Sequence, residues 1–195
     1  METRSRLVLI GPMASGKSAV GRALAQRLHV PFIDSDRVIV ERHGSIGSLF
    51  AREGEPFFRS IEADVAREAL GTDDAVVSLG GGAVLHPRTR ALLADAAVVF
   101  LDTDLDTVLP RISADTARPL LTGSPAERWQ ELYTQRRPTY ASLASITIDT
   151  RGRSVRAVAD AVLQELHRDL RTDRDVVPAP IIRPTDESEM QPHVD

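Results

Sequence analysis

The chain has 195 residues, of which 42% are hydrophobic, and this is enough to build one core of ordinary size without a second domain. A net charge of −4 without a basic cluster argues against a nucleic acid as the main partner, because binding to a phosphate backbone relies on concentrated positive charge. The absence of cysteine excludes disulfides and thiolate metal sites, and no apolar run approaches the roughly 18 residues that cross a bilayer, so we expect a soluble, cytoplasmic protein.

The first predicted strand, residues 6–10, leads directly into residues 11–18, which have the form G-x-x-x-x-G-K-S, and a helical pattern follows over residues 19–28. The two glycines allow turns that point successive N–H groups at phosphate oxygens, and the helix N-terminus adds its positive dipole end. Lys17 can then reach the β- and γ-phosphates, and the Ser18 hydroxyl can ligate Mg²⁺. A glycine-containing turn that matches by chance is the alternative, but the strand before and the helix after favour a phosphate-binding loop.

Lys17 is the only lysine in the chain, since every other residue in the Lys+Arg total of 24 is arginine. A coding bias toward arginine explains the other positions. A lysine at this one place suggests that the loop needs a compact ammonium rather than a planar guanidinium.

Short apolar strands and amphipathic helices alternate along the rest of the chain. Strands are expected at residues 29–33, 75–79, 97–101 and 146–149, and helices at 37–42, 44–54, 57–70, 87–94, 104–112, 125–144 and 155–170. Pro56 stands where a first-turn proline is tolerated. Strands that are apolar on both faces and separated by helices predict an α/β domain over residues 1–170, with a parallel sheet covered on two sides.

Two segments lack this pattern. Residues 113–124 form a polar loop interrupted by proline, in which Arg118 is a candidate because a lid arginine that folds over the γ-phosphate recurs in phosphoryl-transfer enzymes. Residues 171–195 are rich in proline and acidic residues, and we expect a disordered C-terminal tail there, with docking on a partner or on the domain as the alternative.

Asp34 and Asp36 stand at the end of the predicted second strand, where ligands of open α/β sheets bind. Residues two apart in an ideal strand share a face, so both carboxylates are expected to point into one crevice. Beside a phosphate-binding loop, this suggests that one carboxylate lies near the metal waters and that the other bonds a substrate hydroxyl. A helix N-cap at Asp36 or Ser35 is the alternative.

Three consecutive glycines, Gly80 to Gly82, follow a predicted buried strand. Such a run is entropically costly, so it indicates backbone brought close to a ligand, with N–H groups available to an anion. Arg59 is expected, on pattern alone, to be solvated or paired with Glu62. The Arg-Arg-Pro sequence at residues 136–138 is expected to interrupt the long helix near its end.

Other residues with possible chemistry carry weaker signals. Trp129 is expected to serve core or helix packing rather than to be a stacking platform, and the five histidines show no metal-ligand spacing. The loop residues Pro12-Met13-Ala14 are expected to change loop stiffness more than phosphate contacts.

Six segments together resemble shikimate kinases in their order and spacing, namely residues 11–18, 34–36, 58–62, 80–82, 118–121 and 136–140. The resemblance covers about residues 6–168. It implies a three-layer P-loop kinase fold of the nucleoside-monophosphate-kinase type, with a five-stranded parallel sheet of order 2-3-1-4-5. It also implies transfer of the ATP γ-phosphate, with Mg²⁺, to the 3-hydroxyl of shikimate, a step of aromatic amino-acid biosynthesis that yields shikimate 3-phosphate and ADP.

The same resemblance implies the site residues. Catalytic roles fall to Lys17, Asp36 and Arg118, and Asp36 is the favoured proton acceptor. Shikimate is expected at Asp36, Arg59, Gly80, Gly81, Gly82 and Arg136. ATP is expected at Gly11, Ala14, Ser15, Gly16, Lys17, Ser18, Ala19, Arg111 and Arg118, with Arg111 on adenine. Mg²⁺ is expected near Ser18 and, through water, Asp34.

The expected partners are therefore ATP and shikimate, with no nucleic acid, no membrane and a monomeric state. A related small-molecule kinase such as a gluconate kinase is one alternative, although Arg59 and Arg136 with the glycine run favour a cyclic hydroxy acid. A nucleotide-binding module without catalysis is another, and the presence of Lys17, Asp36 and Arg118 argues against it.

Overall fold

The computed structural model describes residues 6–113 and 124–175. The elements in these ranges are, in chain order, β1 Arg6–Ile10, α1 Lys17–Leu28, β2 Phe32–Asp34, α2 Ser35–His43, α3 Ile46–Leu70, β3 Val76–Ser78, the 3₁₀ turn η1 Ala83–Leu85, α4 Pro87–Leu92, β4 Ala96–Asp102, α5 Leu105–Ser113, α6 Pro125–Leu143, β5 Ile146–Asp149 and α7 Val155–Asp175. No helix in these ranges is both long enough and apolar enough to span a membrane.

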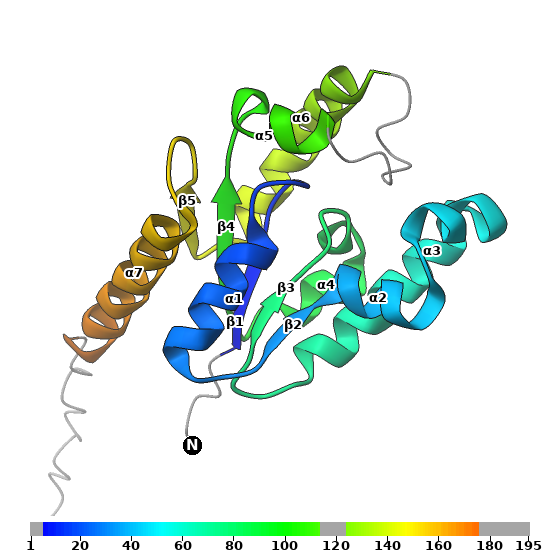
Figure 1. The fold of residues 1–195 in the computed structure, drawn as a ribbon. Coiled ribbons are helices and arrows are strands. Elements are labelled where there is room, and N and C mark those ends of the chain that lie inside the picture. The colour runs from blue at the N-terminus through cyan, green and yellow to red at the C-terminus, as the bar shows by residue number, and fades with distance from the viewer. Residues whose placement is uncertain (1–5, 114–123, 176–195) are drawn as a thin grey trace, which may run out of the picture.

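The five strands form one parallel sheet of order β2-β3-β1-β4-β5, and this confirms the expected topology. The central strand is β1, in which Leu7 pairs with Val76 of β3 on one side and with Ala97 of β4 on the other. Helices cover both faces of the sheet (Figure 1). The molecule is therefore the three-layer α/β domain that the alternation of strands and helices predicts.

The two cores follow from the alternation of side chains along β1, because successive residues of a strand face opposite layers. Val8 and Ile10 pack on one face, with residues of α3 and α6. Leu7 and Leu9 pack on the other face, with residues of α1 and α7. Both faces of the sheet are thus buried. The turns that follow the carboxyl ends of its strands remain as the place for a site.

The second strand, β2, ends at Asp34, one residue after its expected end, and the next helix begins two residues earlier than expected. Helix α2 starts at Ser35, and its N-cap is Asp34, whose Oδ1 accepts a hydrogen bond from the Arg37 N–H at 3.4 Å. The prediction that Asp36 or Ser35 caps this helix is wrong, and so is the argument that a strand brings both carboxylates to one face. Asp36 lies in the first turn of a helix because Asp34 ends the strand.

Three prolines lie within helical stretches, namely Pro56, Pro110 and Pro138. Pro56 follows Gly54, whose φ of 79° kinks α3 between the two expected helices. Pro138 lies inside α6, which continues to Leu143, so the expected interruption does not occur. Buried Trp129 and Tyr140 stand on either side of Pro138, and their packing offsets the one backbone hydrogen bond that a proline removes. Helix α7 also continues past its expected end, to Asp175.

Candidate functional site

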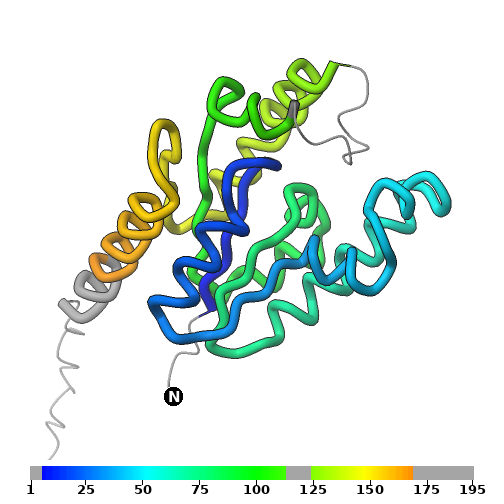
Figure 2. Tube along the Cα trace, viewed as in Figure 1, coloured from blue at the N-terminus to red at the C-terminus, as the bar shows by residue number. Residues whose placement is uncertain are grey.

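The candidate site lies at the carboxyl edge of the sheet. The turn after β1 and the turn after β3 come together at this end of the molecule (Figure 2). A Cβ added to Gly81 would lie 3.4 Å from the Met13 nitrogen and 3.5 Å from the Gly11 carbonyl oxygen. The phosphate loop and the glycine run, 62 or more residues apart in the chain, therefore lie so close that a single added carbon would bridge the space between them.

The phosphate loop, residues 11–18, has the backbone that its glycines predict. Gly11 has a φ of 140°, and a Cβ there would lie 2.7 Å from the Leu101 carbonyl oxygen of β4, closer than real Cβ contacts allow. Gly16, with a φ of 95°, is the N-cap of α1. The first turn of α1 therefore opens onto the loop, where its backbone N–H groups and positive dipole end favour an anion.

Lys17 is buried and folds back over its own loop. Its Nζ donates to the carbonyl oxygens of Gly11 at 3.0 Å and Pro12 at 2.8 Å. An ammonium group can satisfy two carbonyls on neighbouring residues because its donors are arranged around one nitrogen. The loop thus holds a positive charge at the mouth of the helix.

Ser18 and Asp34 supply oxygen atoms, the ligands that Mg²⁺ prefers, and they suit a metal that keeps most of its waters and binds phosphates. Ser18 lies in the first turn of α1, and Asp34 lies at the carboxyl end of β2. Within residues 6–113 and 124–175, no group of three or more acidic or histidine side chains forms a cage for a metal ion. The donor set therefore fits Mg²⁺ that arrives with a nucleotide.

The glycine run is tightly enclosed by charged side chains. A Cβ on Gly80 would collide with the Asp36 carboxylate and lie 2.9 Å from Glu62 Oε1, and a Cβ on Gly82 would collide with the Arg59 guanidinium. The Gly80 N–H donates to the buried Ser35 hydroxyl at 2.9 Å. This N–H is therefore already hydrogen-bonded within the protein. Gly80 allows other groups to approach the backbone closely, but it does not offer the free N–H that was expected.

Arg59 makes two ion pairs, with Glu62 at 2.6 Å and with Glu55 at 2.9 Å. This agrees with the expected pairing to Glu62, and the same guanidinium also lies against Gly82. Partial burial acts to lower the pKa of Arg59, but the charge of Glu62 and the hydrogen bonds to Glu62 and Glu55 together outweigh it, and the pKa is raised above its usual value. The guanidinium remains positively charged beside the glycine run.

Glu62 is 3% exposed and faces charges of both signs. Burial raises the pKa of its carboxyl above the usual value, against the opposing charge of Arg59; the nearby Asp36 raises it further, and Arg136 lowers it. Asp36, Arg59, Glu62 and Arg136 are therefore close enough to form one electrostatic cluster. Sequence reasoning treated Glu62 only as a pairing partner and missed that it is buried; the run of apolar positions around it on α3 was the available signal.

Arg136 is 6% exposed and lies on the buried face of α6. Its Nε has no hydrogen-bond partner among the described residues. A buried guanidinium nitrogen without a partner is costly, so this arginine is suited to receive a carboxylate. Its neighbour Arg137 points elsewhere and pairs with Asp102 of β4 at 2.9 Å.

Helices α5 and α6 both reach the phosphate loop. Arg111 of α5 donates to the Ala14 carbonyl at 2.7 Å, and Trp129 of α6 donates from Nε1 to the Met13 carbonyl at 3.0 Å. Trp129 is buried in the core, as expected, yet its hydrogen bond to the loop was not predicted. The adenine contact of Arg111 stays a prediction. Arg118 and most of the expected lid over residues 113–124 lie outside the described residues.

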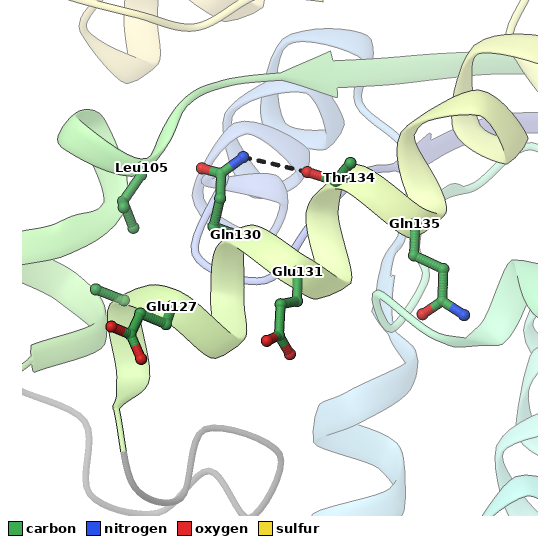
Figure 3. A pocket seen from close by; sticks show the side chains of 7 residues that line it. Leu105, Glu127, Gln130, Glu131, Thr134 and Gln135 are labelled. Atoms are coloured by element: carbon green, nitrogen blue, oxygen red, sulfur yellow. Dashed lines mark hydrogen bonds between the residues drawn. The ribbon is translucent and has the colours of Figure 1, made fainter.

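A second hollow lies away from this cluster. It has a volume of about 750 Å³ and follows one side of α6 beside Leu105 (Figure 3). Its lining includes Glu127 and Glu131, while Gln130 donates to the Thr134 hydroxyl at 3.3 Å. None of the expected site residues lines it, and two carboxylates disfavour an anionic ligand.

Comparison with known proteins gives a consistent result. The family model described as "Shikimate kinase" matches residues 13–167. A curated protein named shikimate kinase from Rhodococcus jostii strain RHA1 is 42% identical over 163 residues, which are 83% of this chain and 97% of that protein.

Solved structures agree. A shikimate kinase from Acinetobacter baumannii, solved in complex with shikimate, has a TM-score of 0.82 and 36% identity, covering 86% of this chain and 96% of that one. A gluconokinase from Sinorhizobium meliloti 1021 has a TM-score of 0.56 and 21% identity, covering 89% and 99%, and shares the fold alone. By the family model and by its relatives, this chain belongs to the shikimate kinase family.

Proposed function

We propose that this protein transfers the γ-phosphoryl group of ATP to the 3-hydroxyl of shikimate, and so forms shikimate 3-phosphate and ADP. The observation that carries the proposal is the close approach of the phosphate loop to Gly81 in the glycine run, which is flanked by Asp36, Arg59 and Glu62. A donor site and an acceptor site in contact are what direct phosphoryl transfer requires, because the reaction depends mainly on positioning and charge neutralisation.

Each half supplies a distinct part of the chemistry. On the donor side, Lys17 and the N-terminus of α1 bind the phosphates, and Arg118 closes over the transferred group. On the acceptor side, Arg59 and Arg136 hold the shikimate carboxylate with paired donors, and the glycine run admits the ring closely. Mg²⁺, held through Ser18 and, by way of water, Asp34, supplies charge neutralisation on the phosphates when bound.

Asp36 completes the transfer step. Its carboxylate accepts the proton of the 3-hydroxyl as that oxygen bonds to the γ-phosphorus and the bond from phosphorus to the leaving ADP oxygen breaks. The position of Asp36 beside Gly80 supports this role, because the next two glycines of the run face the phosphate loop and Arg59 in turn.

The proposal is tested by coupled ADP release with and without shikimate in Asp36→Asn. Shikimate-dependent release should fall by roughly 10²- to 10⁴-fold, the usual contribution of a general base. Affinity for ATP should stay within about twofold, because a donor site does not need this carboxylate. Asp64→Asn, which removes an exposed carboxylate of α3, is the matched control and should keep full turnover. Unchanged turnover in Asp36→Asn would refute the assigned role.

A substrate panel separates this proposal from a gluconate kinase. ADP release should depend on shikimate and not on gluconate, since two arginines beside a glycine run fit a compact cyclic hydroxy acid. If the wild-type protein binds ATP and shikimate but transfers nothing with Mg²⁺, the proposed activity fails and a nucleotide-binding module is supported instead.

We further propose that the protein works as a cytoplasmic monomer on small molecules, without nucleic acid or membrane. Its net charge of −4 disfavours binding to nucleic acid. The catalytic domain would extend through α7 to Asp175, with a lid at about 113–124 that excludes water and a tail after Asp175; this tail and most of the lid lie outside the described residues.

A further inference from the structure

One face of α6 carries a row of large side chains at helical spacing. Trp129, Tyr133, Arg136 and Tyr140 stand at positions i, i+4, i+7 and i+11, which lie on the same side of a helix with 3.6 residues per turn. Trp129 and Tyr140, at the two ends of this row, are each 1% exposed. A single rigid element therefore runs past both halves of the proposed active site.

Trp129 contacts the donor half. Its Nε1 donates to the Met13 carbonyl at 3.0 Å, and its ring stacks on that of Tyr133 with centroids 4.9 Å apart. Met13 and Ala14 pack against the buried cluster that Trp129 forms with residues of α5. A trans peptide points its carbonyl and the following N–H in opposite directions, so this bond turns the Ala14 N–H away from α6.

Tyr140 contacts the acceptor half in the same manner. Its hydroxyl donates to the Gly81 carbonyl at 2.5 Å, and its ring lies 5.3 Å from that of Phe100 in the sheet. The bond fixes the peptide between Gly81 and Gly82 and turns the Gly82 N–H away from the helix. Glycine has no side chain to restrict its peptide, so an external hydrogen bond has more effect here than at other residues.

The two loops and the helix meet with little free space. A Cβ on Gly81 would lie 3.4 Å from the Met13 nitrogen and 3.7 Å from the Tyr140 hydroxyl. The cavity between Pro12, Met13 and this face of α6 measures about 10 Å³, which is no more than the space for one water molecule. A shift of α6 would therefore be passed to both loops rather than absorbed.

We propose that Trp129 and Tyr140 are positioning residues, and that through them α6 fixes the position of the phosphate loop relative to the glycine run. Trp129 sets the backbone of the ATP half, and Tyr140 sets the backbone of the shikimate half. The inference rests on the proposed function and adds to it two residues that would touch neither substrate but would hold the backbone that does.

The test compares how each substitution changes the dissociation constants of Mg·ATP and of shikimate, both measured by calorimetry without turnover. Trp129→Phe keeps the stacked ring and removes the N–H, so it should weaken binding of Mg·ATP roughly three- to tenfold and leave shikimate within twofold. Tyr140→Phe should do the reverse, with roughly three- to tenfold weaker binding of shikimate and ATP within twofold.

Tyr133→Phe is the matched control, because it lies on the same face and its hydroxyl donates to Asp102 of β4 rather than to either loop. It should change neither constant by more than twofold. A purely structural role would lower the thermal midpoint in all three variants without separating the two ligands. Equal effects on both ligands, or no effect on either in Trp129→Phe and Tyr140→Phe, would overturn the proposal.

A second readout does not depend on the variants folding. Trp129 is the only tryptophan in the chain, so its fluorescence reports on the contact with Met13. Mg·ATP should produce a saturable change in the emission of the wild type, and the absence of a change would count against the donor half of the proposal. If ligands bind as expected but no transfer occurs, the proposed function fails while the two binding constants still decide this inference.

Discussion

The donor half and the acceptor half of this site are built in different ways. The phosphate loop uses eight consecutive residues, and its charged group Lys17 is held by carbonyls of the same loop. The acceptor half collects Asp36, Arg59, Gly82 and Arg136 from four separate segments. The first is a local backbone structure, and the second exists only when the domain has packed.

This difference has an energetic consequence. The loop satisfies its own cation within one segment of the chain, and its contact with α6 passes through the hydrogen bond from Trp129 to Met13. In the acceptor half, the buried Glu62 carboxyl lies among charges contributed by α2, α3 and α6. Each of those charges is stable there only while the others are in place. Substitutions should therefore act on one substrate in the donor half and propagate among several side chains in the acceptor half.

The largest effect is expected from Lys17→Met. The loop would lose both the charge that we propose binds phosphate and the two hydrogen bonds from Lys17 to the Gly11 and Pro12 carbonyls. Loss of one well-placed donor lowers kcat by roughly 10²- to 10³-fold, and we expect at least that. Shikimate affinity, measured by calorimetry, should stay unchanged. Lys17→Arg tests the geometry and should also be impaired, because a planar fork does not match two adjacent carbonyls. A near-normal kcat in Lys17→Met would contradict the role given to Lys17 in the donor half.

A smaller effect, on the acceptor half alone, is expected from Gly82→Ala. The new Cβ would displace the Arg59 guanidinium, which is the end of a flexible side chain, so the thermal midpoint should hardly change. The KM for shikimate should rise by about tenfold, the equivalent of one charge-assisted hydrogen bond. Gly81→Ala meets only ordinary contacts at 3.4 Å and beyond, and its effect on this KM should be smaller. An equal rise in both variants would contradict the steric explanation.

The pH dependence of stability should expose the buried charge of the acceptor half. Burial raises the pKa of Glu62 in the folded protein above its usual value near 4.5. The proton on Glu62 therefore stabilises the folded state below about pH 4.5, and this contribution is lost as pH rises through the raised pKa. In Glu62→Gln, which cannot ionise, the free energy of unfolding relative to wild type should increase as the pH rises above about 4.5.

Chemical denaturation of the ligand-free proteins measures this trend. Glu55→Gln removes the exposed partner of Arg59, and its free energy of unfolding should change with pH in parallel with that of the wild type. Parallel curves for Glu62→Gln as well would mean that the buried carboxyl keeps its usual pKa.

The smallest effect on activity is expected from Asp102→Asn, outside both halves. The Asp102 carboxylate accepts hydrogen bonds from the Thr103 N–H, Tyr133 and Arg137. Weakening this buried network should cost about 1–3 kcal/mol of stability, seen as a lower denaturation midpoint. Both KM values should remain within twofold. A selective change in either KM would show that this network belongs to the site.

The comparison also explains what the sequence could predict. Residues 11–18 specify their structure locally, and the alternation of apolar residues in β1 predicts a sheet with two cores, so the fold and the donor half were predictable. The position of Asp36 was not, because a cap at Asp34 decided where the strand ended. Arg59 shows the limit clearly, since its spacing predicts the pair with Glu62, but its contact with Gly82 arises from packing of α3 on the turn after β3.

The roles of Trp129 and Tyr140 were equally out of reach. Their spacing predicts a shared helix face, yet it does not predict which carbonyl each side chain meets. Because α6 continues without a break through Pro138, Tyr140 lies opposite Gly81. The helix-breaking tendency of proline predicts an interruption there instead. Tertiary packing decided both points.

The buried position of Lys17 also limits how this protein can be modified. A chain with one lysine offers acylating enzymes and amine-reactive reagents a single side-chain target, and that target is bonded to two carbonyls inside the phosphate loop. Any lysine acylation of this chain would remove the charge that we propose binds ATP. Modification of the lysine and occupancy by nucleotide should therefore exclude each other, which makes protection of Lys17 from acetylation a direct measure of ATP bound.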